Sequence, residues 1–395
     1  MRASILILLV ILTLATGSEN VWAGEITLST QCPASFEKQA GHCKLRSIYT
    51  DYASLQSAGV GGLKTGLPPL REGFSAEQMD LGRYLFFDPI LSGNGKQSCA
   101  SCHSPDKGFS DGRPRSIGAS GQETTRNAPS LWNVGFLTKF FWDGRATSLE
   151  AQMKGPLYST IEMASSPEKI LANLNGNKEY RRLFALAYAD TNVKNAEAKN
   201  ASATSINIEQ VYHAIAAFET TLISLNSRYD LYAHGVPDAL TKPELEGLNV
   251  FRSFVARCAE CHTPPLFTNQ QIVVIGTPEA AGRSFDPGAG AISHDPNLRG
   301  GFKVPSLRNV ELTAPYMHSG RFATLRDVVS FYNEGRGHAV PKNETLHLHW
   351  HIHEPKLSNA ELDRLVDFLK TLTDESFKPQ RPSVVPSGLP LMLNK

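Results

Sequence analysis

The stretches Cys99-Ala100-Ser101-Cys102-His103 and Cys258-Ala259-Glu260-Cys261-His262 repeat the pattern Cys-x-x-Cys-His, once in each half of the chain. Two thiols one helical turn apart can each add to a haem vinyl group, and the next residue then places its imidazole beneath the iron. The two matches use four of the six cysteines, so coincidence does not explain them. They predict two covalently attached c-type haems, with His103 and His262 as the proximal iron ligands.

Two other kinds of site use similar residues. A zinc site would need the four cysteines and a histidine to converge in one closed cluster. A thioredoxin-like redox pair uses Cys-x-x-Cys but does not require the histidine that follows. Both are therefore less favoured than haem attachment.

The N-terminus has the form of a secretory signal peptide. Met1-Arg2 is followed by an apolar run over residues 5–14, then by polar residues and Val21-Trp22-Ala23 before Gly24, a small-x-small cleavage pattern. A membrane anchor is the competing interpretation, but the run is shorter than the ~20 apolar residues that span a bilayer. We therefore expect residues 1–23 to be removed from an exported, periplasmic protein with no membrane span after processing.

The remaining cysteines and the chain length suggest how the exported chain is organised. In an oxidising compartment, Cys32 and Cys43 are expected to form a disulfide rather than to stay free thiols. That pair would close a loop in an N-terminal extension, residues 24–74. About 370 residues remain after processing, enough for two domains. We expect an N-terminal haem domain over residues 75–235 and a C-terminal haem domain over residues 236–395.

The composition excludes partners selected by bulk charge. The chain has 39 Lys and Arg against 38 Asp and Glu, a formal net charge of +1. Such a balance indicates neither nucleic-acid binding nor attraction to an anionic membrane surface.

Helical signals dominate around the two motifs. Ser75 and Thr241 each precede an apolar helical pattern that leads into a haem motif, so they are the expected N-caps of two equivalent helices. Strand signals are scarce, the best being residues 272–275, and residues 190–207 read as a polar loop. The predicted fold class is mainly α, two cytochrome c-like haem domains packed together with little β-structure. Further helices are expected at residues 168–174, 179–188, 209–225, 324–333 and 359–371.

Several further motifs, in this order, resemble those of one family. They are Leu85-Phe-Phe-Asp, Ser98-Cys-Ala-Ser-Cys-His, Arg126-Asn-Ala-Pro-Ser, Phe141-Trp-Asp-Gly-Arg, Ile161-Glu-Met, Val304-Pro-Ser-Leu-Arg-Asn and Pro315-Tyr-Met-His-Ser-Gly. Over residues 81–372 the chain resembles the bacterial di-haem cytochrome c peroxidase family, and within it the MauG-like branch with its MbnH relatives. The resemblance implies an oxidoreductase in which the N-terminal haem reacts with hydrogen peroxide and the C-terminal haem transfers electrons.

The resemblance also implies the residues of the peroxide site. Gln152, Pro156 and Glu162 keep the order and spacing of the family's set on the open face of the first haem. A carboxylate there can take a proton from peroxide and return it to the leaving oxygen, so Glu162 is the expected general acid-base. Trp142 corresponds to the tryptophan that lies between the two haems, where an oxidisable indole relays charge. Taken alone, each would be an ordinary surface, helix or core residue.

The first haem is expected to be five-coordinate. Peroxidases of the family that need reductive activation carry a histidine in the loop after the first motif, and between Ser104 and Phe140 this chain has none. Met163, next to Glu162, is the remaining side chain able to approach this iron.

The second ligand of the second haem separates the branches of the family. Peroxidases place a methionine fourteen residues after the histidine of Tyr-x-His-x-Gly, which here is His318, and Tyr332 stands at that position. MauG-like proteins have a tyrosine there, and a phenolate oxygen favours the higher oxidation states of iron. The alternatives are Met317 as the ligand, or Tyr332 as a plain core aromatic.

Two further metal sites are considered. In the family a calcium ion lies between the domains, held by an Asn side chain and two backbone carbonyls, and Asn127, Thr313 and Pro315 occupy the matching positions. Residues 347–353, His-Leu-His-Trp-His-Ile-His, would place four imidazoles on one face of an extended segment, which suits Cu²⁺ or Zn²⁺. Without cysteine or carboxylate at fixed spacing, a solvated polar strand is the favoured interpretation of that segment.

The resemblance leads to one expected function and two alternatives. The expected enzyme reacts with H2O2 at the His103 haem and uses a high-valent di-haem state, linked through Trp142, to oxidise an aromatic residue of a periplasmic partner protein, with tryptophan as the expected target. The alternative is a cytochrome c peroxidase that reduces H2O2 to water with electrons from a small cytochrome or cupredoxin. A plain di-haem electron carrier is disfavoured, because a carrier needs neither an open iron nor the set of Gln152, Pro156 and Glu162.

Overall fold

The computed structural model describes residues 25–50, 66–189, 205–335 and 337–391. The expected signal peptide, residues 1–23, and most of the expected loop at residues 190–207 lie outside these ranges. No described helix combines the length and the apolar composition that crossing a bilayer requires.

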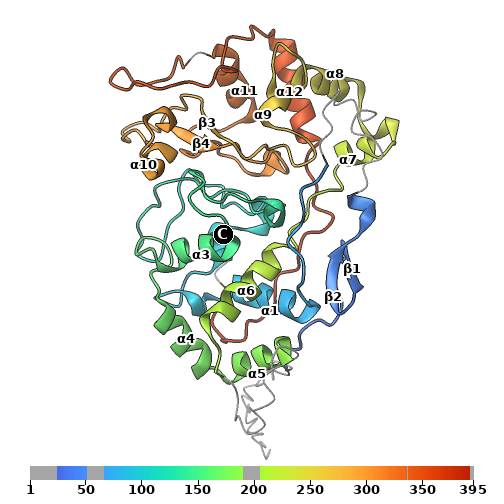
Figure 1. Ribbon diagram of the computed structural model, residues 1–395, viewed down its shortest axis with the longest axis vertical. Coiled ribbons are helices and arrows are strands. Elements are labelled where there is room, and N and C mark those ends of the chain that lie inside the picture. The colour runs from blue at the N-terminus through green and yellow to red at the C-terminus, as the bar shows by residue number, and fades with distance from the viewer. Residues whose placement is uncertain (1–24, 51–65, 190–204, 336, 392–395) are drawn as a thin grey trace, which may run out of the picture.

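Twelve α-helices of the described ranges divide between two bodies, one above the other in Figure 1. The first half of the chain contributes α1 Ala76–Phe87, α2 Cys99–Cys102, α3 Leu149–Tyr158, α4 Pro167–Gly176, α5 Lys178–Ala187 and α6 Ile208–Glu219. The second half contributes α7 Arg228–Ala233, α8 Lys242–Phe251, α9 Cys258–Cys261, α10 Ala289–Ser293, α11 Leu325–Glu334 and α12 Asn359–Lys370.

Two small antiparallel sheets complete the described fold, so the mainly α class with little β-structure is confirmed. β3 Ile272–Val274 pairs with β4 Gly301–Lys303, which confirms the strand predicted at residues 272–275. β1 Phe36–Gln39 and β2 His42–Leu45 form a hairpin that the sequence analysis did not predict, because four-residue strands are too short for alternation to stand out. A disulfide between Cys32 and Cys43 ties β2 to the segment before β1.

The predicted helices are present with small shifts at their ends. The segments expected at residues 168–174, 179–188, 324–333 and 359–371 fall on α4, α5, α11 and α12. Ser75 caps α1, and Gln78 closes the capping box. Thr241 caps α8 in the same way, with Glu244 as its partner. The helices α3, α7 and α10 were not predicted.

One helix ends earlier than its pattern predicts. Apolar spacing favours a helix over residues 209–225, but α6 ends at Glu219. Two consecutive threonines follow, and their hydroxyls donate back to carbonyls of the last turn, each at 2.7 Å. The chain then runs extended, because Asn133 of a distant loop donates its backbone N–H to the Leu222 carbonyl at 2.7 Å. Long-range hydrogen bonding therefore overrides the local apolar period.

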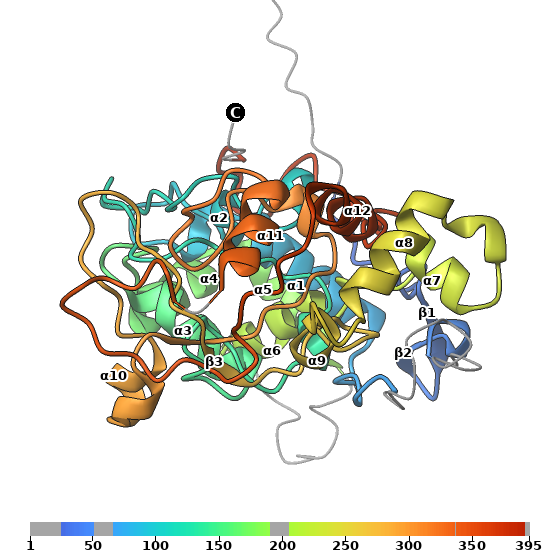
Figure 2. The same cartoon turned by 90° about the horizontal axis from the view of Figure 1, so that it is seen from above.

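Two crossed helix pairs indicate that the halves are copies of one unit. α1 packs on α6 in the first half and α8 on α12 in the second, and Figure 2 shows α8 alongside α12. A Cβ added at Gly82 of α1 would lie 1.8 Å from the carbonyl oxygen of Ala214 in α6. A Cβ added at Gly247 of α8 would lie 1.9 Å from the carbonyl oxygen of Arg364 in α12. Both crossings therefore require glycine, since the two backbones touch.

The correspondence extends along α6 and α12. The added Cβ at the first glycine would lie 2.9 Å from the Cβ of Phe218, and that at the second 2.8 Å from the Cβ of Phe368. Thr221 and Thr371 each donate their hydroxyl to the carbonyl of that phenylalanine at 2.7 Å. An offset of 150 residues therefore aligns these two helices.

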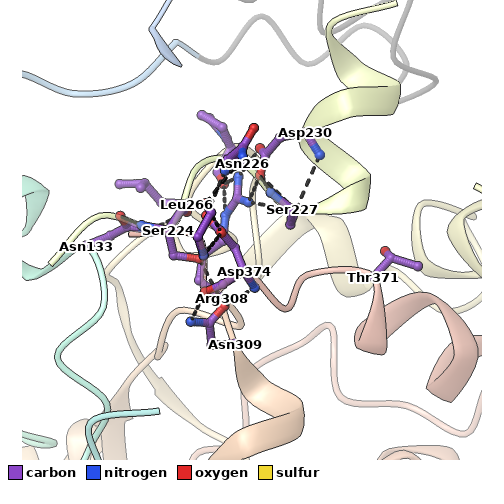
Figure 3. Close-up of polar contacts among 12 residues, drawn as sticks. Asn133, Ser224, Asn226, Ser227, Asp230, Leu266, Arg308, Asn309, Thr371 and Asp374 are labelled. Atoms are coloured by element: carbon purple, nitrogen blue, oxygen red, sulfur yellow. Dashed lines mark hydrogen bonds and ion pairs between the residues drawn. The ribbon is translucent and has the colours of Figure 1, made fainter. Parts of the chain in front are cut away.

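Asn133 and Asn309 make equivalent pairs of side-chain hydrogen bonds in the two halves, and Figure 3 shows both residues at the junction between the halves. The Asn133 side chain accepts from the backbone N–H of Ser224 and donates to its carbonyl, both at 2.9 Å. The Asn309 side chain does the same with Asp374, at 2.7 and 2.8 Å. The Ser224 hydroxyl donates to Asn309 Oδ1 at 3.0 Å. This hydrogen bond links the Asn133 pair of the first half to the Asn309 pair of the second half.

A buried ion pair lies beside this junction (Figure 3). Arg308 and Asp230, whose side chains are 0% and 1% exposed, pair with Nη2 2.8 Å from Oδ1. Burial alone would raise the pKa of Asp230, but the charge of Arg308 and hydrogen bonds from Arg308 and Ser227 lower it. Asp230 therefore stays ionised and holds Arg308 in the core of the second half.

The last described residues return to the first half instead of staying with the second. The Ser387 hydroxyl donates to Asp88 Oδ1 at 2.6 Å, and the Pro386 carbonyl accepts from Asn177 Nδ2 at 3.2 Å. The tail of the expected C-terminal domain, residues 236–395, therefore contacts the first half, because a buried carboxylate of that half accepts hydrogen bonds from Ser387.

Candidate haem sites

Each Cys-x-x-Cys-His motif forms one helical turn followed by its histidine. The backbone N–H of His103 donates to Cys99 O at 2.9 Å, and that of His262 donates to Cys258 O at 2.8 Å. All four motif cysteines are half-buried free thiols. Because residues three apart share a helix face, each turn presents its two thiols together, as attachment of one haem requires.

The two histidines are oriented in the same way. His103 Nδ1 lies 2.8 Å from the carbonyl oxygen of Phe109. His262 Nδ1 lies 3.1 Å from the carbonyl oxygens of both Phe267 and Pro305. A backbone acceptor at Nδ1 fixes the proton there, which leaves Nε2 as the metal-binding atom. Burial lowers the pKa of both histidines, that of His262 to about 4, so both rings are neutral as iron ligands must be.

The alternative of one closed zinc cluster is not supported. Within the described ranges, the group of metal-ligating side chains that converges within 4.8 Å is Glu279, Asp286 and His318, which contains no cysteine. The two motifs remain separate sites, one in each half.

The first motif opens into a cavity that brings the expected peroxide-site residues together. His103 and Cys102 line it from the motif, and Gln152, Pro156 and Glu162 line it from α3 and the turn that follows. The same cavity carries four basic side chains, those of Arg126, Lys139, Arg145 and Lys303. Such cations suit the two propionate groups of a haem, so the residues present fit the cofactor.

Glu162 is poised as a proton carrier. Burial raises the pKa of Glu162 above its ordinary range, and the nearby charge of Arg145 partly opposes the rise. Arg145 is held by Asp143, with Nη1 2.7 Å from Oδ2, and its guanidinium lies 3.5 Å over the Phe141 ring. A carboxyl group of raised pKa exchanges its proton more readily near neutral pH.

Trp142 lies where the two halves meet. Its indole N–H donates to Asn127 O at 2.9 Å, and its own carbonyl accepts from Lys303 N at 2.6 Å. The Trp142 ring contacts His318 of the second half edge to face, with centroids 6.4 Å apart. Trp142 and His318 occupy equivalent positions in the duplicated fold. Each lies two residues after the start of a turn that an isolated β-bridge closes, between residues 140 and 146 for Trp142 and between residues 316 and 322 for His318.

An ion-pair network surrounds this aromatic contact. Arg126 of the first half pairs with Asp143 at 2.5 Å and with Asp286 of the second half at 2.6 Å. His318 Nε2 lies 2.8 Å from a carboxylate oxygen of Glu279. Glu279, Asp286 and His318 therefore form part of a charge-compensated contact between the halves, which accounts for their convergence without a metal ion.

Tyr332 lies on α11 beside the second motif. Burial is the main cause that raises the pKa of Tyr332 well above its ordinary range, and charge on Cys261 and Cys258 would raise it further. The phenol is thus within electrostatic reach of both attachment cysteines. Ser148 caps α3 and Thr324 caps α11, so Tyr332 takes the place in the second half that Pro156 has in the first haem cavity.

The two methionines take different places. Met317 sits in the turn that corresponds to Phe141, and both residues have a left-handed backbone, with φ of 71° and 64°. Met163 is buried and lines the cavity beside the first motif together with Glu162. Met163 therefore remains the methionine able to approach the first iron.

The three residues expected to hold calcium flank the boundary between the halves. Asn127 is buried, donates its backbone N–H to His318 O at 2.8 Å and its side-chain Nδ2 to Arg113 O at 2.7 Å. Its Oδ1 is therefore the atom able to bind a cation. Thr313 and Pro315 lie in the segment just before His318, so the structure brings all three residues to one region.

The histidines of residues 347–353 do not form the expected extended face. The backbone N–H of Ile352 donates to His349 O at 2.9 Å, which bends the segment. His353 Nε2 lies 2.9 Å from Val255 O, and His351 Nε2 lies 2.7 Å from Glu260 Oε2, so both imidazoles turn toward the second motif. The turn breaks the alternation on which a metal site along a strand would depend.

Two buried titratable groups of the first cavity, Glu219 and Lys303, were not predicted from the sequence. Burial lowers the pKa of Lys303 to about 8 and raises that of Glu219 to about 8. For Glu219 a signal was present, since one acid stands within the apolar run 214–222. For Lys303 no local signal existed, because its place depends on the pairing of β3 with β4.

Comparison with known proteins agrees with this geometry. The family described as di-haem cytochrome c peroxidase matches residues 76–238. The cytochrome c551 peroxidase of Nitrosomonas europaea is 33% identical over 85% of this chain and 92% of its own length. The methylamine utilization protein MauG of Methylophilus methylotrophus is 31% identical over 80% of this chain and 88% of its own. A solved MauG-like protein associated with microbial copper homeostasis superposes with a TM-score of 0.70 at 34% identity, over 80% of this chain and 96% of that one.

The chain belongs to the di-haem cytochrome c peroxidase and MauG family. It is therefore an oxidoreductase of the kind that acts on peroxide, with two c-type haems as its cofactors. Relatives of both branches match at similar identity, so the branch has to be argued from individual residues.

Proposed function

We propose that this chain is a MauG-like enzyme that uses hydrogen peroxide to oxidise an aromatic residue, in the first place tryptophan, of a periplasmic partner protein. Membership of the family supports the reaction with peroxide. The choice of a protein as the final substrate rests on the surroundings of the second haem.

The first cavity supplies the groups that peroxide cleavage needs. When bound at His103, the haem provides an iron at which peroxide is reduced. The Glu162 carboxylate takes the proton from one peroxide oxygen and delivers it to the other, so that water leaves instead of hydroxide. The Gln152 amide offers a hydrogen bond to the peroxide, while Pro156 makes an apolar wall without a donor. No histidine of the described loop over residues 104–140 competes for the open face.

The contact between Trp142 and His318 supports transfer of oxidising equivalents between the halves. The indole is held by Asn127 O and the imidazole by Glu279, so both rings are fixed at the boundary. A fixed, oxidisable side chain between two irons shortens each electron-transfer step compared with one direct step. Trp142 is therefore the proposed relay.

Tyr332 is the single observation that carries the proposal. It stands beside Cys258 and Cys261, in the position that corresponds to the open-face residue Pro156 of the first haem. A buried phenol is costly to ionise unless a positive charge binds its oxygen, and a ferric iron supplies that charge. A tyrosinate ligand stabilises oxidised iron, which suits a haem that holds an oxidising equivalent until a partner protein takes it.

The decisive experiment compares two electron sources for the holoprotein. H2O2 is added with reduced cytochrome c or a reduced cupredoxin, and separately with a small exported protein encoded beside this chain. We expect slow oxidation of either small donor and a mass change on a tryptophan of the neighbouring protein, located by peptide mass spectrometry. Rapid, saturable oxidation of the small donors with no change in the neighbouring protein would overturn the proposal.

That second outcome would favour a cytochrome c peroxidase that reduces H2O2 to water. The observation that favours the cytochrome c peroxidase alternative is the 33% identity to the Nitrosomonas europaea peroxidase over 92% of that protein. Both functions use Glu162 in the same way, so they differ in where the electrons come from.

Two further assignments belong to the proposal. A c-type cytochrome with the N-terminal pattern of residues 1–23 is proposed to be exported to the periplasm and processed near Ala23. One Ca²⁺ is proposed between the halves at Asn127 Oδ1 and the backbone carbonyls of Thr313 and Pro315. Chelation of Ca²⁺ should then loosen the contact between Trp142 and His318, seen as a change in tryptophan fluorescence that added Ca²⁺ restores.

A further inference from the structure

A second carboxyl group lies in the first haem cavity and has no place in the proposed reaction. Glu219, the last residue of α6, is 6% exposed and lines the same cavity as His103 and Gln152. Its Oε2 is buried and has no hydrogen-bond partner among the described residues. An unpaired buried acid is rare, because its burial lowers the stability of the fold. Its presence therefore calls for a functional explanation.

Two charged groups act on Glu219 from the sides of α6. Burial is the main cause that raises the pKa of Glu219 to about 8, the carboxylate of Glu150 on α3 adds to the rise, and Arg71 opposes it. Arg71 is ion-paired with Glu150, so its charge is not free to neutralise Glu219. At neutral pH the group is therefore predominantly a protonated acid.

The elements packed beside α6 offer little further charge. On α2, the charge of Glu219 adds to the rise in the pKa of the Cys99 thiol, so the two groups lie within electrostatic reach. α1 presents Gly82 and Phe86 to this part of α6, and both are apolar. The charged side chains that share the cavity with Glu219 are Glu162, Arg126, Lys139, Arg145 and Lys303. The pKa of Glu219 responds to burial, Glu150 and Arg71 rather than to these five groups. Charge that appears in the buried cavity, such as that of an oxidised haem, would act on Glu219 more strongly than it would in water.

The duplicated fold supplies an internal comparison. The offset that aligns Phe218 with Phe368 places Leu369 of α12 at the position of Glu219. Leu369 is also 6% exposed, so the two sites are equally buried. The haem that meets peroxide thus has an acid where the other haem has leucine, and the difference lies at one residue of a shared scaffold.

We propose that Glu219 stores a proton beside the first haem and releases it when that haem loses an electron. With a reduced haem bound at His103, Glu219 would be protonated. When an outer-sphere acceptor such as ferricyanide takes one electron from that haem, the Glu219 O–H bond would break and release one proton to solvent. The carboxylate then balances the positive charge gained by the iron, so the net charge of the cavity is unchanged.

The proposal requires only the first haem at Cys99, Cys102 and His103, and it is independent of the partner protein. It also predicts a difference between the two haems. The potential of the first haem depends on pH through Glu219, whereas the second half has Leu369 at the equivalent position.

The test is a redox titration of the holoprotein between about pH 6 and pH 10, with the two haems followed by their separate ferric EPR signals. The first-haem potential of the wild type should fall by about 59 mV per pH unit over part of this range, since one proton accompanies one electron. In Glu219→Gln the slope should vanish. Glu209→Gln, which removes an exposed acid from the same helix, is the matched control and should keep the wild-type slope.

Two results of the redox titration would overturn the proposal. They are a pH-independent potential of the first haem in the wild type and a slope that persists in Glu219→Gln; if that slope is lost in Glu162→Gln instead, Glu162 is the proton store. If Glu219→Gln fails to take up haem, Glu219→Leu, which copies the environment of Leu369, replaces it. Proton release on oxidation of the wild type in unbuffered solution gives a measurement that needs no variant, and release of no proton contradicts the proposal. None of these readouts uses a partner protein, so failure here is distinguishable from failure of the proposed function.

Discussion

Replacing Gly82 by alanine tests the claim that the halves are built on backbone-to-backbone helix crossings. The added Cβ would lie 1.8 Å from the Ala214 carbonyl oxygen and 2.9 Å from the Cβ of Phe218. Carbon and oxygen atoms that are not bonded stay about 3 Å or more apart, so α1 and α6 must separate by about 1 Å. Because backbone rather than a flexible side chain has to move, the cost lies at the upper end of overpacking effects, about 3 kcal/mol.

The assay is thermal unfolding of the holoprotein, followed at the optical bands of each haem. For a unit of this size about 3 kcal/mol corresponds to a fall of roughly 10 °C in the midpoint of the first half. Gly247→Ala should produce the same fall in the second half, where its Cβ would lie 1.9 Å from the Arg364 carbonyl oxygen. Separate bands are needed because a protein of two haem-bearing halves does not have to unfold in one step.

Gly176→Ala is the control, since nothing lies within 4 Å of a Cβ at this position near the end of α4. It should change the midpoint little, or raise it slightly, because alanine favours a helix over glycine. Two results would contradict this prediction. One is a midpoint for Gly82→Ala that equals that of Gly176→Ala within error. The other is that each of Gly82→Ala and Gly247→Ala lowers the midpoints of both halves equally.

Three further predictions concern the haem sites and the junction. Tyr332→Phe should keep both haems attached but remove the low-spin ferric EPR signal of a His and Tyr pair, and an unaltered spectrum would assign the ligand to Met317 instead. Arg145→Gln should raise the pKa of Glu162 further, because it removes the charge that opposes burial. The reaction with peroxide, which needs the Glu162 carboxylate, should then decline at higher pH than in the wild type, while Arg145→Lys should restore the profile; an unshifted acid limb contradicts this role. Asp230→Asn should cost about 3–5 kcal/mol in denaturant unfolding near neutral pH, since the buried Arg308 then loses its counter-charge. The pKa of Asp230 is lowered in the folded state, so its contribution is present above its ordinary pKa and lost as pH falls through the lowered value. The difference between wild type and variant should therefore shrink in acid, and an equal cost at both pH values would exclude the ion pair as its source.

Local patterns predicted the elements that local chemistry determines. The N-caps Ser75 and Thr241, the strand at residues 272–275 and the two haem motifs were readable because each depends on neighbouring residues. The end of α6 was not, because it is set by hydrogen bonds from Asn133, which lies far away in the sequence. Apolar periodicity contains no information about such partners.

The cavity was predictable in part through resemblance. Order and spacing brought out Gln152, Pro156 and Glu162, and the structure places all three around one cavity with His103. Glu219 escaped because a single acid in an apolar helix is usually turned to solvent. Its inward direction follows from the crossing of α1 on α6, which buries that face of the helix. The same crossing in the second half then shows what the position looks like without the acid.

The segment around Ser387 returns to the first half, which makes that half dependent on residues that are synthesised long after it. Asp88 is fully buried, and its carboxylate accepts from the backbone N–H of Ile90, from the hydroxyl of Tyr180, and from the backbone N–H and hydroxyl of Ser387, which lies 299 residues later. During synthesis the first half emerges early, yet this carboxylate lacks two of its four donors until Ser387 has been added. A proteolytic nick or a premature stop before Ser387 would therefore remove two hydrogen bonds from the buried core of the first half.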